Sequence, residues 1–91
     1  MSFELVPSKR VLKETKELEK QYKISLLDVF LKLKIEPVPA KEFDVVKVGG
    51  SKNTYRVKIG KVRIIYDVYW NEKRIEILKV ERRKDRTYKG F

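Results

Sequence analysis

Three basic residues, Arg56, Lys58 and Arg63, alternate with apolar residues in the stretch YRVKIGKVRII. Successive side chains of a strand point to opposite faces of its sheet, so the alternation predicts a β-hairpin that turns at Gly60 and Lys61. Lys58 and Arg63 would then face each other, and like charges in such a pair are mildly destabilising. We therefore expect these cations to serve an anionic ligand.

Arginine and lysine in this arrangement suit the backbone of RNA. A guanidinium group binds phosphate in a bidentate manner, and an ammonium group supplies a point charge. A nearby tyrosine, Tyr69 or Tyr88, would stack on an unpaired base. The candidates for further RNA contacts are Lys61, Tyr69, Arg82, Lys84, Arg86 and Lys89.

The same cations could support RNA cleavage without a metal, because the 2′-hydroxyl of RNA can attack the neighbouring phosphate. That reaction needs a base, cations for the developing negative charge and an acid for the leaving oxygen. A lysine crowded by cations has a lowered pKa, and a tyrosine in a cationic pocket ionises more easily. Such an enzyme would be weak in isolation and would gain from a scaffold that orients the RNA, since positioning contributes ~7–11 kcal/mol.

The composition limits the chemistry, because the chain contains no cysteine and no histidine. Disulfides and thiolate metal sites are thereby excluded, and the most common general base near neutral pH is absent. Catalysis would depend on Lys, Arg, Tyr, Asp or Glu, and we expect no metal and no cofactor. Asp67 and Glu76 could form a carboxylate pair across two strands, but we interpret them as charge balance.

The formal net charge of +10 is unevenly distributed. Residues 1–51 carry ten basic and eight acidic side chains, whereas residues 52–91 carry thirteen and five. This surplus in one half indicates a surface for a polyanion such as nucleic acid or the ribosome. The alternative is a solvated surface on a small protein rich in Lys and Glu.

Two helices are predicted in the first half of the chain. Apolar residues recur at helical spacing from Ser8 to about Tyr22. Beyond a break there, SLLD offers Ser25 as a helix N-cap and Asp28 as its capping-box partner, and the second helix should end before Pro37. Its expected apolar stripe consists of Leu26, Leu27, Phe30, Leu31 and Leu33.

Five strands are predicted around these helices, at residues 2–7, 43–48, 54–59, 62–70 and 74–81. In the last strand Ile75 and Ile77 have one parity and Leu78 and Val80 the other, which indicates a bulge or a strand covered on both faces. The order β-α-α-β-β-β-β predicts an α+β fold of two layers. Two N-terminal helices would pack on one face of a mainly antiparallel five-stranded sheet.

A chain of 91 residues suits one compact domain, which we expect to span residues 1–91. No apolar run approaches the ~20 residues that span a bilayer. The first residues, MSFELVPSKR, lack the pattern of a signal peptide. We therefore expect a cytoplasmic protein without a membrane partner.

The segments YRVKIGKVRIIYDV and VERRKDRTYK resemble RelE toxins of the RelE/ParE superfamily, archaeal members in particular. The first segment follows the pattern Y-R-x-x-x-G-x-x-R-x-[IV]-Y, and the resemblance covers roughly residues 36–89. It implies a β-α-α-β-β-β-β fold and a ribosome-dependent endoribonuclease, an mRNA interferase that cleaves mRNA in the A site. It also implies a co-expressed RelB-like antitoxin that wraps around the toxin in a hetero-oligomer.

By position, the resemblance also implies roles for single residues. Arg83 would assist the leaving group, and Tyr88 would act as a base or as a stacking platform. The spacing between these two differs among members, which leaves Arg82 or Arg86 as alternatives for the arginine. The implied catalytic set is Arg56, Lys58, Arg63, Arg83 and Tyr88.

Two other functions remain open on the sequence. A ParE-like toxin on the same fold would inhibit DNA gyrase and cut no RNA, but such members typically lack the set formed by Arg56, Lys58 and Arg63. A non-catalytic module that binds RNA or the ribosome would need the charge but not Tyr88.

Overall fold

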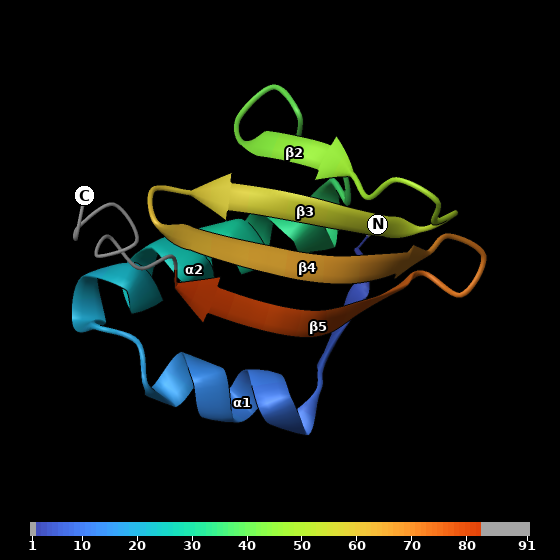
Figure 1. The fold of residues 1–91 in the computed structure, drawn as a ribbon. Helices are drawn as coiled ribbons and strands as arrows, with labels where there is room; N and C mark the ends of the chain where they lie inside the picture. The colour runs from blue at the N-terminus through green and yellow to red at the C-terminus, as the bar shows by residue number, and fades with distance from the viewer. Residues whose placement is uncertain (1, 83–91) are drawn as a thin grey trace.

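The computed structural model describes residues 2–82, which follow the order β-α-α-β-β-β-β (Figure 1). The helices are α1 (Lys9–Lys16) and α2 (Lys20–Ile35). The strands are β1 (Glu4–Pro7), β2 (Asp44–Lys47), β3 (Thr54–Ile59), β4 (Val62–Tyr69) and β5 (Arg74–Arg82). The predicted order of elements is therefore confirmed.

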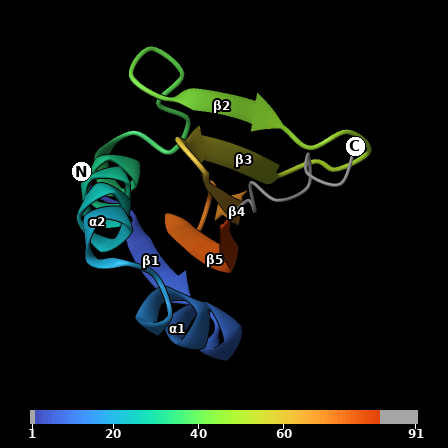
Figure 2. The same cartoon turned by 60° about the vertical axis from the view of Figure 1, so that its left-hand side comes forward.

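The five strands form one sheet in the order β1-β5-β4-β3-β2. β1 pairs with β5 in parallel, and all other neighbouring strands are antiparallel. α2 lies against one face of this sheet, and α1 lies along the edge of the sheet beside β5 (Figure 1 and Figure 2). The two-layer α+β fold with a mainly antiparallel sheet is thus confirmed. None of the described helices is long and apolar enough to cross a membrane.

The core lies between the helices and the face of the sheet that they cover. Tyr66 is fully buried there, and its hydroxyl donates a hydrogen bond to the carbonyl oxygen of Pro37 at 2.7 Å. Burial raises the pKa of Tyr66 because it disfavours the phenolate form. The other buried side chains of the sheet are Val57, Val62, Ile64, Val68, Ile75, Ile77 and Val80.

The predicted hairpin is confirmed in its register. Ile59 is opposite Val62, and Lys58 is opposite Arg63, so the chain turns at the predicted pair of residues. Gly60 has a φ of +56°, a left-handed conformation that glycine adopts without steric cost. The pairing of two like-charged residues is therefore a real feature of the sheet.

A bulge in β5 accounts for the change of parity in its sequence. Ile65 of β4 is opposite Lys79, whereas the next residue, Tyr66, is opposite Ile77. Leu78 is the extra residue, and it is exposed. Of the two predicted explanations, the bulge is correct. Because of it, Ile77 and Val80 both face the core.

The predicted boundary between the helices is wrong. α1 ends at Lys16 and α2 begins at Lys20, so Tyr22 belongs to the second helix. Ser25 lies inside α2, where its hydroxyl donates to the carbonyl oxygen of Gln21 at 3.3 Å. A hydroxyl that bonds to the preceding turn cannot cap a helix start. The end of α2 before Pro37 is as predicted.

α2 is apolar on two opposite faces, which corrects the predicted stripe. Leu27 and Leu31 were expected in the core but are 57% and 54% exposed. Residues three and four apart on a helix share a face, so an apolar pattern alone does not tell which of two faces is buried. The α2 residues in or against the core are Tyr22, Leu26, Val29, Phe30 and Leu33.

Candidate nucleic-acid interface

The predicted cations lie on the outer face of the sheet, which we define as the face opposite the helices. Arg56 and Lys58 belong to β3, and Arg63 belongs to β4. Their neighbours along these strands, Val57 and Ile64, are fully buried on the opposite face. Because side chains alternate between faces, the same backbone pattern that builds the core holds these cations on the outer face.

These residues line a pocket of about 180 Å³, which we call the cationic pocket. A water molecule occupies about 30 Å³ in the liquid, so the pocket has room for a small anionic group. All of its lining side chains are basic. The lining residues are Arg56, Lys58, Gly60, Lys61 and Arg63.

Both arginines that line the cationic pocket have a guanidinium N–H without a hydrogen-bond acceptor among the described residues. The Nε atoms of Arg56 and Arg63 are buried, and no residue within 2–82 accepts a hydrogen bond from either. A buried donor without a partner costs about 1–3 kcal/mol. A ligand with several acceptor oxygens would satisfy these groups, so the pocket is suited to phosphate.

Glu81 contacts Arg63 of the cationic pocket, and Lys79 contacts Glu81; neither residue was predicted from the sequence. A Glu81 carboxylate oxygen lies 3.4 Å from Nη2 of Arg63, and the other lies 2.9 Å from Nζ of Lys79. Glu81 is opposite Arg63 in the sheet. The change of parity at Leu78 in the sequence could have identified Lys79 and Glu81. The bulge at Leu78 turns both side chains toward the outer face.

Arg82 is not brought to the cationic pocket. It is opposite Val62, which faces the helices, and its Nη2 lies 3.2 Å from a carboxylate oxygen of Glu19. Its guanidinium carbon is 5.4 Å from the centre of the Tyr22 ring. Arg82 therefore contacts the start of α2 on the helical side of the sheet.

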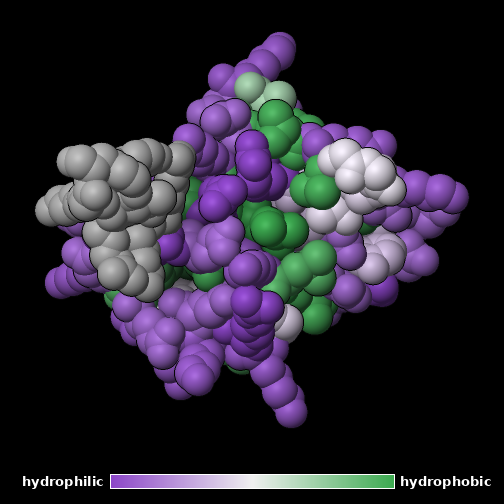
Figure 3. Space-filling view, in the orientation of Figure 1, coloured by the Kyte–Doolittle hydropathy of each residue, from purple (hydrophilic) through white to green (hydrophobic). Residues whose placement is uncertain are grey.

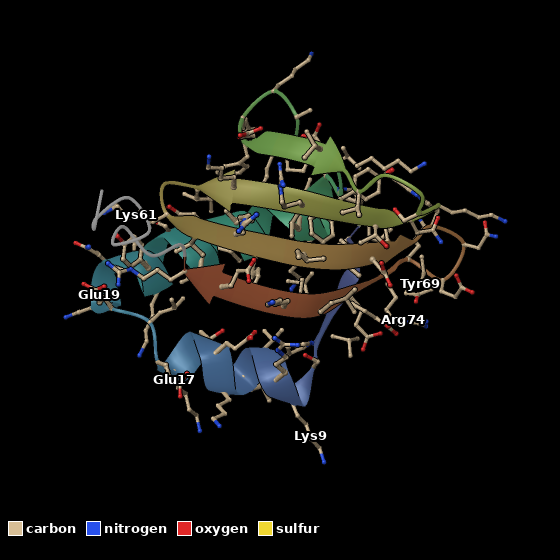
Figure 4. The ribbon with its side chains drawn as sticks, viewed as in Figure 1. Lys9, Glu17, Glu19, Lys61, Tyr69 and Arg74 are labelled. Carbon is tan, nitrogen blue, oxygen red and sulfur yellow. The ribbon has the colours of Figure 1, made fainter. Side chains whose placement is uncertain are left out.

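Tyr69 lies on the outer face but at the other end of β4 from the cationic pocket. Figure 4 shows Lys61 and Tyr69 at opposite ends of the sheet. The guanidinium carbon of Arg74 is 4.6 Å from the centre of the Tyr69 ring, so one face of the ring is covered. The negative charge of Glu76, with burial and Asp67 as smaller causes, raises the pKa of Tyr69.

Asp67 and Glu76 are opposite each other and form an acidic end of the outer face. Asp67 accepts a hydrogen bond from the hydroxyl of Thr54 at 2.5 Å, and Glu76 pairs with Arg74 at 3.2 Å. Glu76 is thus paired with a cation, as charge balance requires, whereas Asp67 is held by a hydroxyl group. Between the two ends, an apolar strip crosses the face, with hydrophilic side chains on both sides of it (Figure 3).

The remaining predicted site residues lie outside the described residues. β5 ends at Arg82, opposite the first residue of β4 and next to the turn that contains Lys61. The predicted tail therefore follows a strand that ends beside the cationic pocket. The residues concerned are Arg83, Lys84, Arg86, Tyr88 and Lys89.

The chain is similar to known proteins over almost its whole length. The family model described as "ParE toxin of type II toxin-antitoxin system, parDE" matches residues 5–87. A protein of Methanocaldococcus jannaschii that is named toxin RelE1 is 38% identical over 84 residues, which span 92% of this chain and 93% of that protein.

Two solved structures share the fold. A chain in the archaeal RelE–RelB complex from Pyrococcus horikoshii OT3 matches with a TM-score of 0.83 and 36% identity, over 93% of this chain and 99% of that one. The isolated RelE toxin of E. coli matches with a TM-score of 0.78 and 20% identity, over 91% of this chain and 86% of that one. The second likeness concerns the fold alone.

Proposed function

The chain belongs to the RelE/ParE superfamily of toxins from type II toxin–antitoxin systems, and from this premise we propose that it is an mRNA interferase. In this proposal it is a metal-independent endoribonuclease that cleaves mRNA in the ribosomal A site and so inhibits translation. The observation that carries the proposal is the cationic pocket, in which two buried guanidinium nitrogens lack an acceptor within the described part of the chain.

The proposed reaction begins with attack of the 2′-oxygen of a ribose on the adjacent phosphorus. The bond from phosphorus to the 5′-oxygen breaks, which leaves a 2′,3′-cyclic phosphate and a 5′-hydroxyl. Arg56, Lys58 and Arg63 would neutralise the charge that develops on the phosphate oxygens. The positive charge of Arg83 would stabilise the departing 5′-oxygen, which takes its proton from water, and Tyr88 would take the proton of the 2′-hydroxyl or stack on a base.

The ribosome supplies what the small pocket lacks in this proposal. A pocket of about 180 Å³ holds one phosphate region and cannot fix the path of an RNA strand. A ribosome holds its mRNA in place, and the surplus of positive charge in residues 52–91 suits ribosomal RNA. Such a substrate also implies a cytoplasmic protein.

We further propose that a RelB-like antitoxin neutralises the toxin in a hetero-oligomer. The RelE chain of Pyrococcus horikoshii, which is 36% identical to this chain, was solved in a complex with RelB. An acidic segment of an antitoxin would compete with RNA for the cationic pocket, because both offer anionic oxygens to the same arginines.

A second candidate function is inhibition of DNA gyrase, because the matching family model is described as a ParE toxin. This function would not need a phosphate pocket with the geometry of an RNA-cleaving site. The retained Arg56, Lys58 and Arg63 therefore favour the interferase.

The proposal is tested by mapping 5′ ends of a defined mRNA on programmed ribosomes, with parallel samples that lack ribosomes. Wild type is compared with Arg63→Ala and Tyr88→Ala. Arg74→Ala is the matched control, because it removes an arginine at the acidic end of the same face. We expect a cut within the A-site codon, only with ribosomes, which Arg63→Ala and Tyr88→Ala abolish and Arg74→Ala retains.

Other outcomes identify the alternatives. Salt-sensitive binding to ribosomes without any cut would indicate a non-catalytic binding module. If the wild-type protein neither cuts mRNA nor binds ribosomes, the interferase proposal is contradicted, and DNA gyrase becomes the target to test. Tyr88→Phe then separates the two roles of the tyrosine, because a stacking ring survives the change and a base does not.

A further inference from the structure

The outward side of α2 presents four aliphatic side chains to solvent. Ile24, Leu27, Leu31 and Ile35 are 58%, 57%, 54% and 69% exposed. At 100° per residue they fall within an arc of about 80°. We call these four residues the outer stripe; it lies opposite the α2 residues that enter the core.

The outer stripe has the properties of an interaction surface. Single exposed apolar residues are normal on proteins, but a contiguous set marks a binding site. Its spacing of three, four and four residues is the spacing by which one helix packs along another. The stripe faces away from the sheet, so it is separate from the cationic pocket on the outer face.

The charges around the outer stripe select its partner. Lys23 lies four residues before Leu27 and Lys34 three after Leu31, so both border one side of the stripe, and Lys20 lies at its N-terminal end, four residues before Ile24. Asp28 borders the other side, four residues after Ile24, so basic residues outnumber acidic ones around the stripe by three to one. Each of these lysines is exposed, and none forms an ion pair with a described residue. Lys32, by contrast, points to Glu42 at 2.6 Å and to Glu36 at 3.4 Å.

This pattern disfavours a second copy of the chain as the partner. In a two-fold dimer the same patch lies on both subunits, so the bordering lysines would face one another. A partner with glutamate or aspartate in place of those lysines would pair with them. RNA is also a poor fit, because aliphatic side chains offer it neither hydrogen bonds nor aromatic stacking.

We propose that the outer stripe docks an amphipathic helix of a partner protein whose apolar seam is flanked by acidic residues. The inference rests on the described residues of α2 and not on RNA cleavage. Under the proposed function, the antitoxin would carry this helix. The antitoxin would then bind the helical layer with this helix, while another segment of the same antitoxin occupies the cationic pocket on the opposite side.

The probe is a fluorescein-labelled 21-residue peptide with leucine at heptad positions a and d and glutamate at e and g. Its glutamates repel one another, so it stays unpaired without a basic partner. Binding to the full chain is measured by fluorescence anisotropy. The variants are Leu27→Gln with Leu31→Gln, and Leu12→Gln as the matched control, because Leu12 is an equally exposed leucine of α1.

We expect the double variant to weaken binding by about tenfold or more, since truncated anchors of an interface cost more than 1 kcal/mol. Leu12→Gln should bind as wild type does. A peptide with lysine at e and g should bind at least tenfold more weakly. Circular dichroism checks that every variant is folded, and the exposed positions predict no loss of structure.

The proposal is overturned if the double variant binds as tightly as wild type. It is also overturned if Arg63→Ala weakens binding instead, because the peptide would then occupy the cationic pocket. Sedimentation that reveals a dimer of wild type, abolished in the double variant, would replace the acidic partner by a second copy. None of these outcomes bears on the mapping of mRNA cuts, so the two proposals fail separately.

Discussion

At the level of single residues, the charge of the cationic pocket depends on Glu81, which contacts both Arg63 and Lys79. An RNA phosphate must displace this carboxylate to bind Arg63 fully. The carboxylate thus balances the cations of the outer face while RNA is absent. Arg56 and Lys58 form no such ion pair with a described residue, so a phosphate can approach both without displacing a carboxylate.

Glu81→Gln is expected to strengthen the binding of a single-stranded RNA oligonucleotide about two- to fivefold. The change removes an exposed ion pair that contributes up to about 1 kcal/mol and frees two cations for phosphate. Fluorescence anisotropy measures the affinity. Glu72→Gln, in an exposed turn at the other end of the sheet, is the control, and an equal gain there would mean that only net charge matters.

Tyr66→Phe is expected to lower the free energy of unfolding by about 1–3 kcal/mol, because the buried Pro37 carbonyl loses its donor. The raised pKa of Tyr66 adds a pH dependence. The folded state keeps the proton longer, so this contribution is complete below the ordinary pKa of 10.0 and is lost as the pH rises above it.

Urea unfolding of wild type and Tyr66→Phe between pH 7 and pH 11 measures both effects. Tyr22→Phe is the control, because no described residue is hydrogen-bonded to the Tyr22 hydroxyl; Tyr55 is unsuitable because its charge also raises the pKa of Tyr66. The difference between wild type and Tyr66→Phe should shrink above pH 10. A difference that is constant with pH would contradict the link between burial and the raised pKa.

At the level of elements, α1 covers the edge of β5 where β1 stops. β1 pairs with β5 only as far as Ile77. Beyond it, the backbone N–H of Val80 donates to a carboxylate oxygen of Glu14 at 2.9 Å, and the Ser8 hydroxyl lies 3.5 Å from the carbonyl oxygen of Leu78. Side chains of α1 and its cap thus satisfy the bulged strand, which keeps that edge from pairing with another chain.

Ser8→Ala is expected to lower the free energy of unfolding by about 1 kcal/mol, whereas Ser25→Ala should not lower it. Ser8 caps α1, since its Oγ accepts from the N–H of Val11 at 3.1 Å. Ser25 is internal to α2, where alanine is the better helix former. Thermal or urea unfolding measures both. The reverse order of effects would restore the predicted helix start at Ser25.

At the level of the whole molecule, the two layers present different surfaces to partners. The outer face of the sheet has a cationic end and an acidic end, and the helical layer carries the outer stripe with lysines along one side. A polyanion and a protein helix can therefore engage opposite sides of one small fold. The radius of gyration of 13.5 Å means that both surfaces lie close together.

The division of the outer face predicts how RNA binding depends on salt. Each phosphate contact to single-stranded RNA contributes about 0.7 to the slope of log affinity against log salt. Arg63→Ala should reduce the slope by about 0.7, because Arg63 lines the cationic pocket. Arg74→Ala should leave the slope unchanged, because Arg74 lies at the acidic end of the outer face, beside Glu76 and Tyr69. Anisotropy titrations across a range of KCl concentrations measure the slopes. Equal reductions would show that RNA covers the whole face.

The sequence by itself determined the hairpin, the order of the elements and the cations of the outer face. Strand side chains alternate with a period of two regardless of what packs on them, so Arg56, Lys58 and Arg63 share a face once their neighbours enter the core. The change of parity between Ile77 and Val80 indicated a bulge or a strand covered on both faces, and the strand register decided for the bulge.

Only the tertiary structure decided which of two apolar faces of α2 is buried and where α1 ends. A helix can bury either face, and the choice depends on the sheet that packs against it. Folding also decided the place of Arg82, which contacts the distant Glu19, and that of Tyr69, which is covered by Arg74 of the paired strand. These contacts join segments far apart in the chain or depend on strand pairing, so no local pattern specifies them.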